Sequence, residues 1–298
     1  MNAVTDTVPV EGIGEHGDRP RRGRLFRRLR RSPLAMAGLI VLCVAVLAAL
    51  LAPVLAPYSP DHADFDAVFQ PPGSPGHILG TDSLGRDILS RILYGARASL
   101  LVGLLSVVLA LAVGVPLGLI AGFFSALDSV VSRFTDLVLA FPFLILAVGL
   151  AAIRGASLSN AALAIGIAQI PGIIRVTRSE TLRLKSLDYV AAAVAEGATD
   201  LWVVVRHILP NATSVLIVQA TVAIPAAILG EAVLSFLGLG IQPPSPSLGT
   251  MLSEAQQSIS RAPWTAVIPG LAIMVLTLAF NLFGDGLRDA LDPRGSRR

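Results

Sequence analysis

The chain has 298 residues, of which 54% are hydrophobic and 14% are charged, and its mean hydropathy is +0.73. Charged residues make up about a quarter of a typical soluble domain, so this composition excludes an ordinary water-soluble globule and indicates a protein that lies largely in lipid. The sequence pI of about 9.6 does not indicate a nucleic-acid partner, because the arginines cluster at the edges of apolar segments.

The N-terminal segment, residues 1–33, contains the basic run RPRRGRLFRRLRR. We interpret it as a cytoplasmic tail that resists translocation and contacts membrane lipid, and we expect no nucleic acid to bind there. The apolar run that follows resembles a signal peptide in its basic flank. It is too long for a typical signal peptide, and Pro57 directly follows the best cleavage position, Ala56. We therefore expect an uncleaved first transmembrane helix over residues 34–56.

Six long segments contain no Asp, Glu, Lys or Arg, and each is long enough to approach the roughly 20 apolar residues that a transmembrane helix needs. These segments are residues 34–60, 98–127, 137–153, 155–174, 207–230 and 262–284. Residues 232–253 are also nearly free of charge, but the stretch QPPSPS within them has prolines that would leave backbone groups unpaired in lipid. We therefore predict six crossings and place that stretch outside the bilayer.

The basic residues predict the orientation of these crossings. If the N-terminus is cytoplasmic, 18 of the 23 Lys and Arg residues fall in segments on the cytoplasmic side. The positive-inside rule therefore places both termini in the cytoplasm. The predicted fold class is an all-α integral membrane protein with six transmembrane helices in the cell (inner) membrane. Beyond the first helix we divide the chain into an external segment (57–97), a five-helix core (98–285) and a cytoplasmic tail (286–298).

The external segment contains a predicted amphipathic helix over residues 82–93. Asp87 and Arg91 are spaced as an i,i+4 ion pair on one face. The other face is apolar and consists of Ile88, Leu89, Ile92 and Leu93. We favour a helix that lies on the outer membrane surface over one that contacts the substrate directly.

The predicted spans contain almost no ionisable residues. Glu231 comes closest, at the external end of the fifth span, and we name Glu231 and Ser235 as candidate residues of the pore or of an external gate. Glycines and prolines within the spans either kink the helices or allow close packing, and we favour packing for each of them. These residues are Gly114, Pro116, Gly118 and Pro225.

Residues 175–211 form the longest predicted cytoplasmic loop. Ser186 or Asp188 can cap a helix that begins near Tyr189 and ends at Gly197 after about two turns. Thr199 or Asp200 can cap a second piece, which we expect to stop before Pro210. The residue spacing supports two interpretations equally. The segment is either a connecting helix that merely contains helix-forming alanines, or a helix with small side chains on one face that docks on a cytoplasmic protein.

Three classes of membrane protein compete at this stage: an ion-coupled transporter or channel, a membrane-embedded enzyme, and a permease driven by a separate motor. The chain has one cysteine, Cys43, and four scattered histidines, so it offers no evident metal-ligand cluster. It contains neither a GxSxG nucleophile motif nor a GxxxxGK[ST] phosphate loop. We therefore expect no catalytic site, no cofactor and no metal in this chain, and we favour the passive permease.

The cytoplasmic segment resembles the coupling motif of bacterial ABC importer permeases, which reads EAA, three residues, Gly, nine residues and then I-x-L-P. Ala192, Ala193 and Gly197 match this motif, as does the closing pair Leu209 and Pro210. Two positions depart from it: Ala191 stands where the family has Glu, and His207 stands where it has Ile. The resemblance implies that ATPase coupling involves Ala191, Ala192, Ala193, Glu196, Gly197, Asp200, Leu209 and Pro210, with Glu196 or Asp188 as a substitute for the missing Glu.

Two further blocks resemble the permeases of dipeptide and oligopeptide importers, the DppC/OppC type. They are HILGTDSLGRDILSRILYGARASL (77–100) and GEAVLSFLGLGIQPPSPSLGTM (230–251), the second with Leu248 where Trp is common. With the six spans, the resemblance covers residues 34–292 and implies a type I ABC importer fold. It also implies four kinds of partner: a homologous second permease subunit, two cytoplasmic ATP-binding subunits, an extracytoplasmic peptide-binding protein, and membrane lipid.

The resemblance leaves the substrate open. Permeases of this type carry dipeptides, longer peptides, glutathione, nickel complexes or opines, and their selectivity lies largely with the binding protein. We expect di- or oligopeptides, with the other cargoes as alternatives. A less favoured alternative is a secondary transporter that is coupled to an ion gradient.

Overall fold

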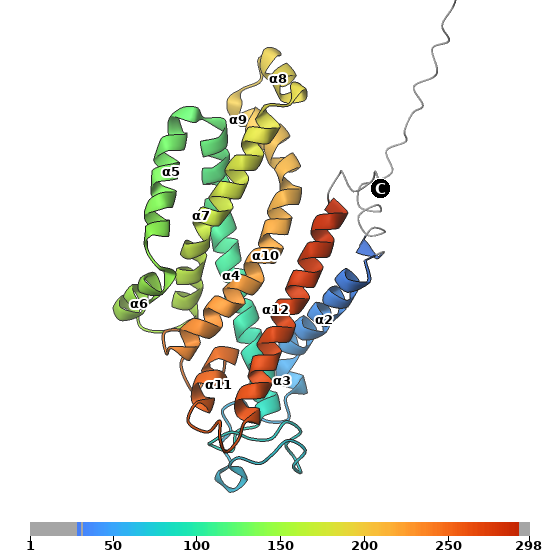
Figure 1. The fold of residues 1–298 in the computed structure, drawn as a ribbon, viewed down its shortest axis with the longest axis vertical. Coiled ribbons are helices and arrows are strands. Elements are labelled where there is room, and N and C mark those ends of the chain that lie inside the picture. The colour runs from blue at the N-terminus through green and yellow to red at the C-terminus, as the bar shows by residue number, and fades with distance from the viewer. Residues whose placement is uncertain (1–28, 31, 292–298) are drawn as a thin grey trace, which may run out of the picture.

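A computed structural model describes residues 29–30 and 32–291, and the described chain folds as an all-helical bundle (Figure 1). The predicted N-terminal basic tail and most of the predicted C-terminal tail lie outside the described residues. The elements are α2 (Pro33–Leu50), α3 (Ala52–Leu55), η1 (Phe65–Ala67), α4 (Ile88–Phe123), α5 (Ser125–Ala140), α6 (Phe143–Arg154), α7 (Leu158–Lys185), α8 (Asp188–Ala195), α9 (Asp200–Val203), η2 (Val204–Ile208), α10 (Leu209–Phe236), α11 (Leu248–Ala255) and α12 (Trp264–Leu291).

Five of these helical stretches are long and apolar enough to cross a membrane: α2, α4, α7, the run from α9 to α10, and α12. A sixth crossing exists if α5 and α6 together form one broken span, because the two helices meet at an angle of 80°. The predicted third span, residues 137–153, is thus not one straight helix, because it contains the end of α5, the break at Phe141 and Pro142, and most of α6. Pro142 disfavours helical geometry in the preceding residue, and Phe141 is accordingly extended, with φ −91° and ψ 120°.

The two ends of the bundle differ in what they carry. The first turn of α2, the last turn of α12 and the short helix α8 all lie at one end, which we call the α8 end (Figure 1). The external segment and α11 lie at the opposite end, which we call the α11 end (Figure 1). This arrangement agrees with the predicted topology, in which the 175–211 loop and both termini share the cytoplasmic side.

The longest helix, α4, begins earlier than its span requires. It runs for 36 residues from Ile88 to Phe123, or about 54 Å at 1.5 Å per residue. The separate surface helix predicted over 82–93 is therefore wrong, because residues 82–87 form turns and the rest continues into α4. Ile88 and Arg91 are each 1% exposed, whereas Leu89, Ile92 and Leu93 are partly buried, so these first turns of α4 are packed against the rest of the chain along at least one side.

The closest packing in the bundle joins α4 to α7. Gly114, Gly118 and Gly122 recur every four residues along one side of α4 and are all buried. A Cβ added at Gly118 would lie 2.5 Å from Thr177 Cβ, and one added at Gly122 would lie 2.5 Å from Thr181 Cβ. These distances are below any real carbon contact, so the predicted packing role is confirmed for Gly118 and Gly114, where the nearest atom is Ile173 Cβ at 2.7 Å.

The hydroxyl groups in this seam do not need water. Thr177 donates to the Ile173 carbonyl at 2.8 Å, and Thr181 donates to the Thr177 carbonyl at 2.7 Å. Each buried hydroxyl is thus satisfied within its own helix, as burial in an apolar environment requires.

A second pair of helices, α2 and α12, packs closely in the same way, with Gly38 of α2 against the Ala279 carbonyl of α12. Pro225 is buried inside α10, which continues through it to Phe236.

We predict that Gly118→Ala destabilises the subunit by about 1–3 kcal/mol, the usual effect of overpacking a close-packed core. Gly172→Ala is the matched control, because Gly172 lies in the partner helix α7 and a Cβ there meets no atom within 4 Å. The measurement is the melting temperature of each purified variant in detergent. Equal melting temperatures for the two variants would contradict the close α4–α7 approach.

Candidate functional site

The candidate site at the α8 end begins where α7 ends. Leu187 occupies the N-cap position of α8 and makes no side-chain capping bond. The predicted capping by Ser186 or Asp188 is wrong: Ser186 donates to the Arg183 carbonyl at 2.9 Å, and Asp188 is already helical. Asp188 still favours this helix, because a carboxylate in the first turn interacts well with the helix dipole.

Gly197 ends α8 through backbone geometry. Its φ of +87° lies in the left-handed region that only glycine adopts easily. The Gly197 N–H donates to the Val194 carbonyl at 3.0 Å and the Ala198 N–H donates to the Ala193 carbonyl at 3.1 Å, which is the Schellman pattern of helix termination. A Cβ at Gly197 would meet no atom within 4 Å, so conformation rather than space requires glycine at this position.

The second piece does not stop before Pro210, contrary to the prediction. Thr199 occupies the N-cap position of α9 without a side-chain bond, and the chain then passes through a π turn, η2, directly into α10. In this turn the Leu209 N–H donates to the Val204 carbonyl, five residues back. The wider turn shifts the hydrogen-bond register by one residue, which lets the helix continue past a proline that has no N–H to donate.

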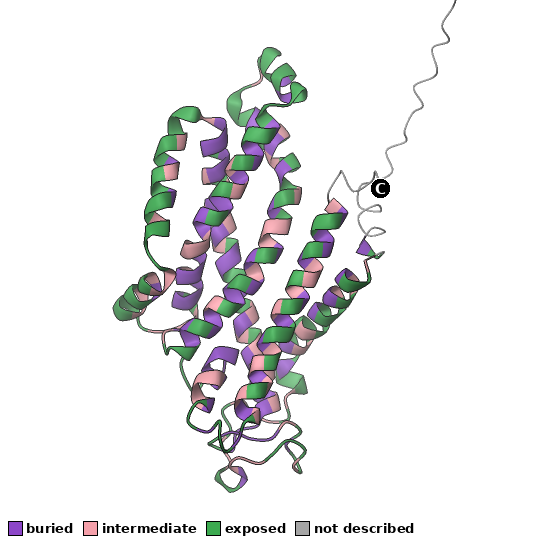
Figure 2. Cartoon of the chain, in the orientation of Figure 1, coloured by how far each residue is buried: buried purple, intermediate pink, exposed green. Residues whose placement is uncertain are grey.

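The helix α8 presents a buried side and an exposed side. Val190 and Ala193 point into an apolar cluster whose other buried members are Leu119, Phe123, Leu184, Val203, Val204, Ile208, Ala212 and Leu216. Most of the other predicted coupling residues are exposed, and Figure 2 shows that the segment formed by α8 and α9 is largely exposed as a whole. Those exposed are Ala191, Ala192, Glu196, Gly197, Asp200 and Pro210, while Leu209 is partly buried.

Sequence reasoning missed the apolar part of this surface. Tyr189, Val194, Leu201 and Trp202 are all exposed at the α8 end. All four belong to the short helices α8 and α9 and are large side chains that face outward. An exposed apolar patch with acidic residues beside it is typical of a protein docking surface. The signal was present in the sequence as large apolar residues that interrupt a charged loop.

Glu231 and Ser235 belong to α10, and both side chains are buried within the helical bundle. Their exposed fractions are 0% and 2%. Ser99 of α4 donates to one carboxylate oxygen of Glu231 at 2.6 Å, and Ser235 donates to the other at 2.6 Å. Ser235 in turn accepts from the Ile241 N–H at 3.1 Å, which connects the group to the loop after α10. The role of these residues in a pore or gate stays a prediction, and it requires α4 and α10 to separate around Glu231.

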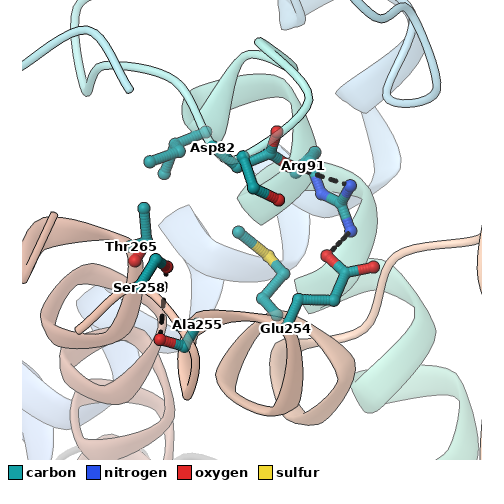
Figure 3. Close-up of a pocket in the computed structure, with 9 residues that line it drawn as sticks. Asp82, Arg91, Glu254, Ala255, Ser258 and Thr265 are labelled. Atoms are coloured by element: carbon teal, nitrogen blue, oxygen red, sulfur yellow. Dashed lines mark hydrogen bonds and ion pairs between the residues drawn. The ribbon is translucent and has the colours of Figure 1, made fainter. Parts of the chain in front are cut away.

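A cluster of four buried or half-buried charges holds the α11 end together, and Figure 3 shows three of its members, Asp82, Arg91 and Glu254. Arg86 and Arg91 each contact Glu254 of α11 at 2.8 Å, and each contacts Asp82 as well, at 2.7 and 3.2 Å. The predicted Asp87–Arg91 pair is wrong, because Asp87 is the N-cap of α4. It accepts from the Ser90 N–H at 2.8 Å, and its other oxygen lies 3.0 Å from His77 Nδ1.

The cavity beside this cluster is lined by Asp82, Arg91 and Glu254, among others (Figure 3). Its volume is about 10 Å³, which is room for at most one water molecule. The cluster therefore fastens the external segment to α11 rather than forming a pocket for a solute. The less favoured interpretation of residues 82–93, direct contact with the substrate, gains no support from this cavity.

The fold and this surface define a multi-pass membrane protein in which a short helix, α8, projects beyond one end of the spans and carries exposed apolar and acidic residues (Figure 1). Residues 114–297 match the family model for the binding-protein-dependent transport system inner membrane component, and residues 22–72 match the N-terminal transmembrane domain of oligopeptide transport permease C. The chain therefore belongs to the family of binding-protein-dependent transport system inner membrane components and is a multi-pass inner-membrane permease subunit.

Individual relatives extend over nearly the whole chain. A dipeptide transport system permease from Haemophilus influenzae is 47% identical over 266 residues, which is 87% of this chain and 90% of the relative. A di/tripeptide transport system permease from Pseudomonas aeruginosa is also 47% identical over 266 residues, covering 87% and 88%. A glutathione transport system permease from Pectobacterium atrosepticum is 42% identical over 294 residues, covering 98% and 97%.

The solved inward-facing MetNI methionine ABC transporter contains a chain with the same fold. Its TM-score is 0.58 at 20% sequence identity, and the match covers 67% of this chain and 96% of that one. The likeness confirms the type I importer fold that the sequence predicts. At this identity it supports the fold alone.

We predict that Glu254→Gln loosens the external segment, because it leaves Arg86 and Arg91 facing a neutral side chain. Breaking a fully buried pair costs roughly 3–5 kcal/mol, and we expect a smaller loss because the Glu254 side chain is 25% exposed. The measurement is hydrogen–deuterium exchange of residues 57–87, which should quicken. Glu196→Gln, at the opposite end, is the control and should leave that exchange unchanged; unchanged exchange in both variants would contradict the fastening role of the cluster.

Proposed function

We propose that this chain forms half of the translocation pathway of an ATP-driven importer of di- and oligopeptides. The observation that carries the substrate class is the 47% identity, over 87% of the chain, to permeases named for dipeptide and di/tripeptide transport. Sequence identity at this level and over this length means that the similarity extends over the whole membrane domain and is not confined to one motif. It supports a shared cargo class more strongly than any pocket in the described chain does.

The proposed assembly pairs this chain with a homologous second permease subunit and two cytoplasmic ATP-binding subunits. The family's defining description supports an external partner, since it names transport that depends on a binding protein; we propose an extracytoplasmic peptide-binding protein. The exposed apolar residues beside Asp188, Glu196 and Asp200 support a docked motor at the α8 end. ATP hydrolysis then resides in those partner chains, and this chain needs no cofactor of its own.

The proposed mechanism uses α8 as a lever. Motion of a docked ATPase would displace α8, and the apolar cluster around Val190 and Ala193 would transmit the displacement to α4, α7 and α10. Such coupling works only if the two pore states hold α8 differently, because an equilibrium shifts only by differential interaction. We propose that the short loop between Gly197 and Asp200 and the single-turn α9 supply the freedom for two such arrangements.

Glutathione is the second candidate substrate. The relative from Pectobacterium atrosepticum that carries this name is 42% identical over 98% of the chain. Glutathione is itself a small peptide with free carboxylates, so one pathway can serve both cargoes if the binding protein selects between them. Nickel complexes, opines and ion-coupled transport have no comparable supporting observation.

We predict that Gly197→Trp abolishes most uptake while the subunit remains in the membrane. A bulky side chain at this position strains the left-handed turn and blocks the surface on which a motor would dock. Gly155→Trp is the matched control, because Gly155 has φ +82° and equally open space but lies at the α11 end. The measurement is uptake per membrane-inserted subunit; equal uptake by the two variants would contradict a docking role for α8.

We predict that a strain lacking this chain loses uptake of labelled dipeptides and recovers it when the chain is restored. Labelled glutathione, oligopeptides and nickel ion are tested in parallel, and restoration of glutathione uptake without dipeptide uptake would replace the first proposal by the second. Vesicles that contain this chain alone should move no solute. Flux driven by an ion gradient in those vesicles would contradict the ATP-driven mechanism.

A further inference from the structure

His207 joins the two short helices at the α8 end to the start of the fifth span. Its ring centroid lies 4.8 Å from that of Trp202 on α9, with an angle of 68° between the planes. It also lies 6.0 Å from the ring of Tyr189 on α8, with an angle of 54°. His207 itself belongs to the π turn that leads into α10. One imidazole ring therefore contacts side chains from both short helices.

We infer that His207 is a positioning residue that sets the angle of α8 relative to α10 through its ring contacts with Tyr189 and Trp202. We call these three aromatic side chains the aromatic clasp. This inference rests on the proposed coupling function and deepens it by naming the residue that transmits the motion. Tyr189 and Trp202 remain 39% and 49% exposed, so the clasp lies at the boundary between the proposed docking surface and the membrane domain.

The clasp supplies a directional contact that the apolar cluster lacks. The buried side of α8 consists of Val190 and Ala193, whose burial is favourable but has little orientation dependence. Aromatic pairs instead prefer particular offsets and tilts. The loop from Glu196 to Thr199 contains Gly197 and cannot by itself hold α8 at one angle. Orientation of α8 is thus left largely to Tyr189 and its ring contact.

The surroundings of His207 indicate that its ring acts on the short helices by packing and not through a hydrogen bond. Its Nε2 is buried and has no hydrogen-bond partner. Its backbone carbonyl accepts from Asn211 Nδ2 at 2.6 Å, and the same nitrogen lies 3.4 Å from the Tyr189 hydroxyl. The backbone at 207 is thereby tied to α10 and the ring is directed at the short helices. A phenylalanine ring at this position should preserve the clasp.

The test is a double-mutant cycle on the complete transporter. Variants His207→Ala, Tyr189→Ala and the double variant are expressed in a strain that lacks this chain, and uptake of a labelled dipeptide is measured per membrane-inserted subunit. ATP hydrolysis is measured on the complex purified through a tag on this chain and placed in nanodiscs. The quantity compared is uptake divided by ATP hydrolysed.

Each single variant should lower this ratio roughly two- to tenfold, the factor that corresponds to losing one aromatic pair. The double variant should be no worse than His207→Ala, because both changes remove the same contact. His207→Phe should restore the ratio. His62→Ala is the matched control and should leave the ratio unchanged, since His62 stacks on Tyr58 at 6.2 Å at the opposite end of the bundle.

Three results would overturn the inference while leaving the proposed function intact: a wild-type ratio in His207→Ala, independent losses that multiply in the double variant, or failure of His207→Phe to restore the ratio. If His207→Ala does not reach the membrane, the comparison of Tyr189→Ala with His207→Phe still decides the question. Uncoupled wild-type transporter, with no peptide uptake linked to ATP, would instead overturn the proposed function and the inference with it.

Discussion

The contact between α4 and α7 is the interaction on which the other parts of the structure depend. Glycines at every fourth position of α4 let its backbone approach Ile173, Thr177 and Thr181 of α7. In lipid there is no hydrophobic force between apolar helices, so such close packing is the main source of specific association. Because α7 leads directly into α8, and α4 carries Phe123 into the same apolar cluster, the α4–α7 contact also determines where α8 lies.

The N-terminal end of α4 is held in place by ion pairs and not by close backbone packing. Arg91 lies one turn into the helix and joins Asp82 and Glu254, which are far apart in sequence, across the base of the bundle. Outside the hydrocarbon region water competes with such pairs, and burial of the arginines limits that competition. A single continuous helix of 36 residues therefore connects an ionic cluster near its first turn with an apolar cluster near its last.

The sequence predicted the features that composition and local backbone preference control. The all-helical fold, the set of long apolar helices and the end of α8 at Gly197 all follow from apolar length or from the φ angle of one residue. The partners of Arg91 could not be predicted, because Glu254 lies 163 residues away and the nearer Asp87 is occupied as an N-cap. The enclosure of Glu231 also depends on α4 packing against α10, which no local pattern reveals. The continuation through Pro210 required a π turn, an exception to the usual reading of proline as a helix stop.

The π turn has a consequence for how the sequence determines the orientation of α8. Five residues, Val204–Ile208, occupy a turn wider than that of an α-helix, so the segment holds one residue more than an uninterrupted helix would contain. Each residue of an α-helix advances the facing direction by about 100°. Removing one residue here would restore regular winding and swing α9, with α8 attached, by more than a quarter of a turn about the axis of α10. The direction in which α8 faces thus depends partly on the number of residues in this segment, which an insertion or deletion would change even if every side chain in the surface were kept.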